Sequence, residues 1–354
     1  MTAKTAATRD ELPGADAARP VAIWLGVCCL LVLSMIVLGG VTRIVHAGLS
    51  ITEWRPITGI VPPLSEQAWR DALGLYRASP EGRLVRVDVD MAGFQRIYLV
   101  EWAHRLLGRA IGVVFLVPLI VFARSGRLSR ARTWRLGALF ALGGAQGVVG
   151  WWMVRSGLVD EPRVSPRLLA AHLLLGVTLL GGLLWITLGS LPKGDAITTP
   201  ASPSVRRAAS VLLGLVLATI AWGALMAGHH AGLVAPTFPD MMGDWIPRGL
   251  RARALGPRDL FDDPLTVHFV HRVLAFTTAG VALVAAIAAR KCAPRVGLAL
   301  LIVVAAQIAL GGAVVVRWVP PALAALHQLV AMLVFAAALT LRHATRAALS
   351  SPVG

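Results

Sequence analysis

The stretch EWAHRLLGR, residues 101–109, places a carboxylate, an imidazole and two guanidinium groups directly before a long apolar run. Residues 110–123 (AIGVVFLVPLIVFA) contain no charged side chain, so this segment is expected to lie in lipid. Charged side chains inside a bilayer cost free energy, and they usually occur where a function requires them. The polar side chains of this stretch are therefore the first candidates for a functional site: Glu101, His104, Arg105 and Arg109.

Four short motifs occur twice, in the same order, along the chain. HAGL at 46–49 recurs at 230–233, and HRxL at 104–107 recurs at 271–274. AQGVVGWWMVR (145–155) resembles AQIALGGAVVVR (306–317), and SPRLLAAHLLLG (165–176) resembles VPPALAALHQLVA (319–331). These matches predict a tandem repeat of four spans, which gives both halves the same orientation about an axis along the membrane normal.

The repeat isolates one histidine in the second and one in the fourth span of each half: His104, His172, His271 and His327. The last three follow the expected start of their spans by about five or six residues, which is roughly 8–9 Å at the rise of an α-helix. His104 lies farther into a longer helix, so all four histidines can share one depth in the outer leaflet.

Two imidazoles facing each other across a helix bundle suit the axial ligation of heme iron. A lone buried histidine is more often a satisfied core residue, but four at equivalent positions favour ligation. Zinc is the weaker alternative, because it needs a third or fourth ligand nearby.

An arginine follows each second-span histidine, Arg105 after His104 and Arg272 after His271. A guanidinium pairs well with a heme propionate in a low dielectric. Arg43 and Arg109 are weaker candidates for the same role. The alternative is that these arginines extend to interfacial water.

The two halves differ three residues before the second-span histidine, where Glu101 in the first half corresponds to His268 in the second. A carboxylate beside only one of two metal centres suggests that the centres have different functions. Glu101 is then a proton donor or a group that positions a substrate near a reactive centre. A structural ion pair with Arg105 is the open alternative.

Composition supports a membrane protein, because 56% of the 354 residues are apolar, 15% are charged, and mean hydropathy is +0.72. We predict an all-α polytopic protein whose eight transmembrane helices form two tandem four-helix bundles related by pseudo-two-fold symmetry. The expected spans are 21–42, 94–123, 135–154, 168–189, 208–228, 265–289, 296–316 and 321–341.

The net charge of +16 comes largely from loops on one side of the membrane, such as 124–135 with its five arginines and no acid. The positive-inside rule places both termini and these loops in the cytoplasm, and this explanation of the charge makes nucleic-acid binding unnecessary. We expect a multi-pass protein of the bacterial inner membrane with its histidines toward the periplasm. The expected divisions are a cytoplasmic tail, an N-terminal half, a cytoplasmic linker, a C-terminal half and a second cytoplasmic tail: 1–20, 21–189, 190–207, 208–342 and 343–354.

Several segments together resemble the heme A synthase family: GGVTRIVHAGLSITEWRPITGIVPP (39–63), EWAHRLLGR (101–109), AGLVAPTFPDMMGDWIP (231–247) and the four histidines. The resemblance covers about residues 21–342. Within it, GLSITEWRPITGIVPPLSEQAW (48–69) and EWAHRLLGR are similar to the branch of the family found in alphaproteobacteria and mitochondria. Some branches carry a cysteine pair in the first outer loop. The cysteines here, Cys28, Cys29 and Cys292, lie elsewhere.

The resemblance implies an oxidoreductase that converts heme O to heme A by oxidising the C8 methyl to a formyl group through successive hydroxylations. It implies that His104 and His172 flank the substrate heme, that Glu101 is the essential acid, and that His271 and His327 ligate a heme b. It further implies a heme O synthase as a partner. An electron donor and a second copy of this chain, in a homo-oligomer, are the other expected partners. A diheme b-type electron-transfer protein is the alternative, and a transporter of parallel repeats is disfavoured by long uninterrupted spans.

Overall fold

The computed structural model describes residues 15–55, 57–159, 162–191, 200–251 and 256–347. In this part of the chain the secondary structure is helical, with one isolated bridge between Met241 and Asp244 and no β-strand. Most of the predicted tail 1–20, the centre of the linker 190–207 and the end of the tail 343–354 lie outside the described residues.

Among the described residues, eight helices are long and apolar enough to cross a membrane. They are α1 (Ala15–Ile44), α4 (Met91–Arg124), α5 (Arg130–Ser156), α6 (Pro166–Leu188), α7 (Pro203–Gly228), α10 (Pro264–Ala288), α11 (Pro294–Val316) and α12 (Pro321–Ala347). The predicted all-α polytopic fold with eight spans is confirmed. α1 begins before, and α12 ends after, the predicted span, because alanine-rich sequence continues the helix beyond the apolar run.

Local sequence explains where several of these helices begin. Asp90 caps α4 by accepting a hydrogen bond from the amide of Gly93, and Asp263 caps α10 by accepting one from the amide of Thr266. α6, α7 and α10 also carry proline in their first turn, where the missing N–H costs nothing.

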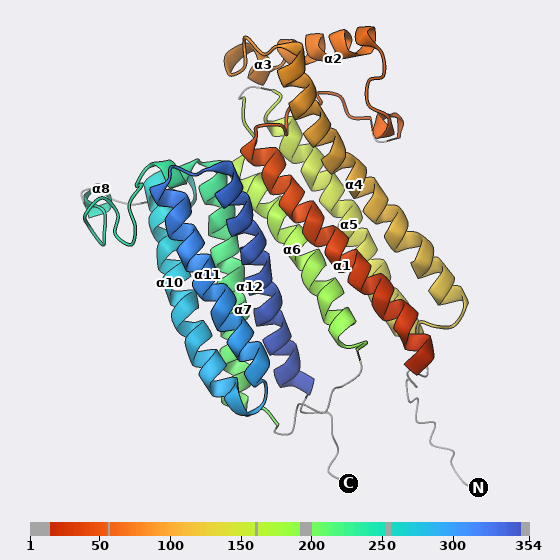
Figure 1. Ribbon diagram of the computed structural model, residues 1–354, viewed down its shortest axis with the longest axis vertical. Helices are drawn as coiled ribbons and strands as arrows, with labels where there is room; N and C mark the ends of the chain where they lie inside the picture. The colour runs from red at the N-terminus through yellow and green to blue at the C-terminus, as the bar shows by residue number, and fades with distance from the viewer. Residues whose placement is uncertain (1–14, 56, 160–161, 192–199, 252–255, 348–354) are drawn as a thin grey trace.

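The long helices pack as two groups of four, side by side in Figure 1. In the first group α1 packs on α4, α4 on α5, α5 on α6 and α6 on α1; in the second, α7 packs on α10, α10 on α11, α11 on α12 and α12 on α7. The groups meet through α6 with α7, α1 with α12, and α6 with α12. This equivalence of contacts is compatible with the repeat read from the sequence.

Side chains of both groups share one apolar core, which includes Leu183 of α6, Leu212 of α7 and Phe335 of α12. The Gln328 side chain of α12 donates a 2.7 Å hydrogen bond to the carbonyl of Ile36 in α1. The start of α1 and the end of α12 lie at the same end of the molecule, as eight spans require (Figure 1).

The segment between α1 and α4, which we call the first outer segment because the positive-inside rule predicts it on the outer side, contains short helices of its own. The 3-10 turn η1 (Thr58–Ile60) and the helices α2 (Glu66–Ala78) and α3 (Pro80–Leu84) lie beyond the end of the bundle, next to the extended end of α4 (Figure 1). Leu73 and Tyr76, three residues apart on one face of α2, are buried against Phe94 of α4. This apolar contact fixes α2 over the outer end of α4.

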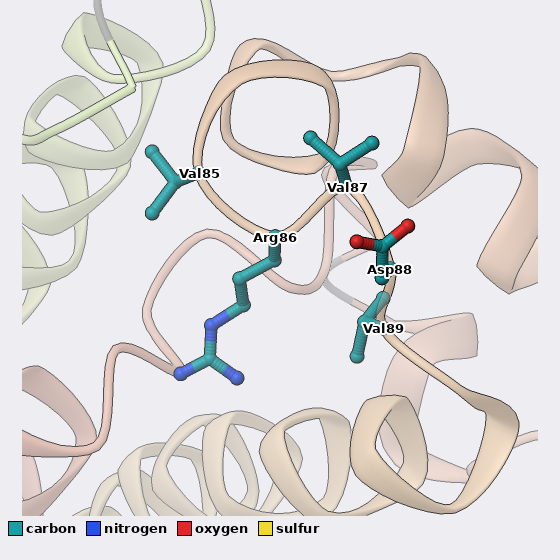
Figure 2. A pocket seen from close by; sticks show the side chains of 5 residues that line it. All are labelled: Val85, Arg86, Val87, Asp88 and Val89. Atoms are coloured by element: carbon teal, nitrogen blue, oxygen red, sulfur yellow. The ribbon is translucent and has the colours of Figure 1, made fainter.

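After α3, residues 85–89 line a surface hollow, shown in Figure 2. Arg86 extends away from the other labelled side chains and donates a 2.9 Å hydrogen bond to the carbonyl of Val45, just beyond α1. The hollow contains none of the candidate site residues. The bond to Val45 joins the outer segment to the end of α1.

The second outer segment holds short elements: η2 (Ala231–Leu233), α8 (Arg248–Arg251) and α9 (Asp259–Asp262). The turn η3 (Ala289–Lys291) lies at the other end of α10. Trp222 of α7 donates a hydrogen bond to the carbonyl of Leu260, so α9 is held against the end of the second group.

Candidate functional site

The four histidines identified by the repeat lie on diagonally opposite helices of each group. His104 is on α4 and His172 on α6, and both helices pack against α1 and α5, while α6 also contacts α7 and α12 of the other group. His271 is on α10 and His327 on α12, which in the same way pack against α7 and α11. Each histidine pair therefore belongs to one four-helix group, His104 with His172 and His271 with His327.

The donor set at each pair suits heme iron better than zinc. Buried Nδ1 atoms with no hydrogen-bond partner occur in all four rings: His104, His172, His271 and His327. Such atoms cost free energy unless the ring has another interaction to make. Among the described residues, no group of three or more His, Cys, Asp or Glu side chains could hold a metal ion. Heme needs only two protein ligands, whereas zinc sites use three or four.

Glu101 is buried, with 3% of its surface exposed, one turn outward from His104. Its Oε2 accepts hydrogen bonds from the Ser50 hydroxyl at 2.7 Å and the Ile51 amide at 2.8 Å. Its Oε1 accepts from Nε of Arg105 at 3.1 Å and from Nη2 at 2.6 Å. Arg105 in turn donates to the carbonyls of Ile51 and Glu53. Glu101 and Arg105 therefore hold the segment after α1 against α4.

The equivalent place in the second group has different chemistry but a similar connection. Nε of Arg272 donates to Nε2 of His268 at 3.0 Å. Its remaining nitrogens donate to four backbone carbonyls of the segment after α7, those of Ala235, Thr237, Pro239 and Asp240. Each second-span arginine thus fixes the outer segment of its own half. In the second half a buried imidazole, 1% exposed, replaces the carboxylate.

The weaker arginine candidates also bond to outer backbone. Arg109 donates to the carbonyl of Arg55 at 3.0 Å, and Arg43 donates to the carbonyl of Ala227. Arg43 also lies 3.2 Å from Nε2 of His230. Arg43 therefore connects α1 with the end of α7, across the boundary between the two groups.

His46 and His230, which occupy equivalent positions of the repeat, are in contact with each other. The rings of His46 and His230 stack with centroids 5.7 Å apart and an interplanar angle of 11°. Both residues have left-handed backbone angles, with φ of 53° and 52°. That conformation is uncommon for a residue with a side chain. Their shared position in the HAGL motif was the available signal, but the contact itself depends on how the halves meet.

Two glutamines lie beside the fourth-span histidines. The Gln146 amide of α5 donates to the backbone carbonyl of His172 at 2.8 Å, and the Gln307 amide of α11 lies 3.2 Å from Nε2 of His327. Hydrogen bonding between helices accounts for both glutamines.

The fold and the site define a polytopic helical membrane protein with a histidine pair in each of two four-helix groups. A family model described as cytochrome oxidase assembly protein, COX15-CtaA, matches residues 22–339. The chain belongs to this family.

Individual relatives cover nearly the whole chain. A protein named "Heme A synthase" from Nitrosospira multiformis is 39% identical over 335 residues, which are 93% of this chain and 94% of the relative. Proteins of the same name from Parvibaculum lavamentivorans and Paracoccus denitrificans are 42% and 40% identical over 90% and 92% of this chain. The matches include 92% and 87% of those two relatives.

Proposed function

We propose that this protein is a heme A synthase, an oxidoreductase that converts heme O to heme A in the membrane. The observation that carries the proposal is the arrangement of the histidines, one pair on diagonal helices of each four-helix group, in a chain whose relatives bear that name. Each pair provides two imidazoles for one heme.

In this proposal the two halves have different functions. The half 21–189 binds the substrate heme between His104 and His172, and the half 208–342 holds a heme b between His271 and His327. The heme b supplies electron transfer when bound. The support is the asymmetry at one position, where Glu101 in the first half is replaced by His268 in the second.

The proposed reaction oxidises the C8 methyl group of heme O by successive hydroxylations, followed by loss of water. The formyl carbon is four electrons more oxidised than the methyl carbon, so each of the two hydroxylations needs an oxidant. With dioxygen in that role, each hydroxylation takes up one O2, two protons and two electrons from the electron donor, and it releases one water; loss of water from the resulting geminal diol then gives the formyl group. Glu101 is the residue assigned to the reacting end, one turn outward from His104. Arg105, Arg272, Arg43 and Arg109 are the candidates to face propionates, in addition to the backbone bonds that they already make.

The proposal extends to location and partners. The protein is a multi-pass component of the bacterial inner membrane, with cytoplasmic termini and heme sites toward the periplasm. It receives heme O from a heme O synthase and exchanges electrons with a separate redox partner. Assembly as a homo-oligomer is compatible with these functions.

A diheme b-type electron-transfer protein is the second candidate. The observation that favours it is the equivalence of the two histidine pairs, because an electron carrier needs no difference between its centres. The synthase binds a farnesylated heme and oxidises it, whereas the electron carrier does neither.

The deciding experiment is extraction of heme, with chromatography and mass analysis, from wild type and Glu101→Ala proteins co-expressed with a source of heme O. We expect heme B and heme A from wild type, and heme O or a hydroxylated intermediate from Glu101→Ala. Only heme B from both proteins, without any farnesylated heme, would overturn the synthase proposal and leave the electron carrier.

Arg105→Met separates the chemical role of Glu101 from its structural role. This variant removes the same ion pair but keeps the carboxylate, and breaking a partly buried pair costs about 3–5 kcal/mol in either variant. If Glu101 takes part in the reaction, Arg105→Met retains more heme A production than Glu101→Ala at equal thermal stability. Equal losses would instead assign Glu101 to holding the outer segment.

A further inference from the structure

Each of the four histidine rings lies edge-on against a glycine of a neighbouring helix. A β-carbon built on Gly39 of α1 would lie 3.0 Å from Cε1 of His104, and one on Gly150 of α5 would lie 2.8 Å from Cε1 of His172. In the second group, the corresponding distances are 3.2 Å from Gly223 of α7 to His271 and 3.1 Å from Gly311 of α11 to His327.

The four contacts are equivalent in sequence as well as in space. Gly150 and Gly311 each follow a glutamine by four residues, and Gly39 and Gly223 each precede a HAGL histidine by seven. In each half, the two diagonal helices that carry histidines are thus separated by two helices that each present a glycine to one ring. All four rings present the same edge to the glycine: Cε1 is the nearest ring atom and Nδ1 is the second nearest.

The distances show why other residues would disturb the rings. Carbon atoms in contact prefer separations of about 3.5–4.0 Å, so a methyl group at any of these positions overlaps the imidazole. The added carbon is attached to the helix backbone, whereas the imidazole is the end of a rotatable side chain. The ring, not the helix, therefore has to move.

We propose that Gly39, Gly150, Gly223 and Gly311 are positioning residues that set the places of the four imidazoles for heme ligation. The inference rests on the proposed binding of heme by these histidines. Each glycine lets one ring edge approach the helix backbone, so that the ring leaves room for a heme between the diagonal helices. Alanine at any one of them displaces a single imidazole and alters only the heme of that half.

The test compares alanine substitutions on the same helix. Gly150→Ala is matched by Gly147→Ala on α5, and Gly223→Ala is matched by Gly214→Ala on α7, because a β-carbon on either control glycine meets no atom within 4 Å. Alanine has a higher helix propensity than glycine, so these changes do not weaken the helices themselves. Thermal unfolding and gel filtration verify that each variant is folded.

The measurements are heme content per chain, the electron paramagnetic resonance of ferric low-spin heme, and the midpoint potential of each centre. We expect Gly150→Ala and Gly223→Ala each to lose or shift about half of the low-spin signal, that of one bis-histidine centre. The controls keep wild-type spectra. Gly311→Ala provides a second, independent test in the C-terminal half if Gly223→Ala does not fold.

Two histidine variants separate the outcomes. If His172→Ala and His271→Ala each lose a centre while the glycine variants match wild type, the histidine ligation stands and the positioning role is wrong. The same conclusion follows if the control glycines disturb the hemes as much as Gly150 and Gly223 do. If both histidine variants retain both centres, the proposed ligation is itself wrong, and the positioning role with it.

Discussion

The buried charged side chains of the outer end are held by the protein's own groups. Glu101 accepts hydrogen bonds from Ser50, Ile51 and Arg105, and Arg272 donates to His268 and to loop carbonyls. A guanidinium has five donors and no acceptor, so a partly buried arginine needs several oxygen partners. Backbone carbonyls of the outer segments supply these partners, four for Arg272 and two for Arg105. An ion pair between Glu101 and Arg105 is the structural alternative that the sequence left open. It is compatible with Glu101 also acting on a bound heme.

Glu81 of α3 is a buried carboxyl outside the spans, 3% exposed, whose Oε2 has no hydrogen-bond partner. Burial raises the pKa of this carboxyl from its ordinary value of 4.5 to about 7, with Arg86 opposing the rise. Between these values the folded protein binds more protons than the unfolded chain. The free energy of unfolding therefore falls as pH rises through this interval.

We predict that Glu81→Gln raises thermal stability at pH 8 relative to wild type, by about 1–3 kcal/mol, and has little effect at pH 5. Gln keeps the size of the side chain and carries no charge to bury. The measurement is the unfolding temperature in detergent across this pH range. Glu66→Gln on the exposed face of α2 is the control. Parallel pH profiles for wild type and Glu81→Gln would contradict the prediction.

At the scale of elements, each second-span helix is connected to the segment that leaves the first span of its half. α4 holds the segment after α1 through Arg105, and α10 holds the segment after α7 through Arg272. These segments lie over the ends of the helices that carry the histidines.

Arg272→Lys tests this connection in the second half. Lysine has one nitrogen and cannot reproduce the fork that bonds the carbonyls of Ala235, Thr237, Pro239 and Asp240. We predict faster hydrogen exchange of the Met242 and Gly243 amides, which bond within this segment. Loss of these bonds lowers the local opening free energy by about 2–3 kcal/mol.

Arg248→Lys, at a side chain that is 89% exposed, is the matched control for Arg272→Lys. It should leave exchange of both amides at the wild-type rate. Unchanged exchange in Arg272→Lys would show that other contacts order the segment. Exchange is measured by mass spectrometry in detergent or nanodiscs, because the readout is then independent of heme content.

At the scale of the whole molecule, the two groups meet at the outer side through equivalent residues, the stacked rings of His46 and His230. Burial and Arg43 lower the pKa of both rings, and that of His230 lies at about 4. The other groups acting on the pair are Arg86, Arg163 and His229, all able to carry positive charge. Protonation of either ring therefore places it among like charges.

We predict that wild type loses thermal stability as pH falls from about 6.5 toward 4, because the unfolded histidines bind protons before the folded ones do. The double variant His46→Gln/His230→Gln should lose less over the same interval. His229→Gln is the comparison: it removes one neighbouring group, whose ring bonds the carbonyl of Phe261, but keeps both stacked rings, so it should lose nearly as much stability as wild type. An equal loss in the double variant and wild type would show that the stacked pair does not cause the pH dependence.

Much of this architecture could be read from the chain itself because it depends on local properties. Runs of about 20 apolar residues identify the spans, since lipid requires each to satisfy its own backbone. The tandem motifs isolated His104, His172, His271 and His327 because equivalent positions repeat in order. α2 is not evident from the chain because its contact with Phe94 is made outside any apolar run, and α3 packs on α2.

Sequence alone determined the number of spans, the tandem repeat, and which four histidines occupy equivalent positions in it. Hydropathy and motif spacing can be read along the chain without knowledge of its folding. Only the tertiary structure decided that the histidine helices are diagonal, that His46 meets His230, and that a glycine lies against each ring. It also decided that Glu101 and Arg105 pair with each other and with the loop. The physical reason is that a side chain can bond to several equally suitable partners, and packing between distant segments selects among them.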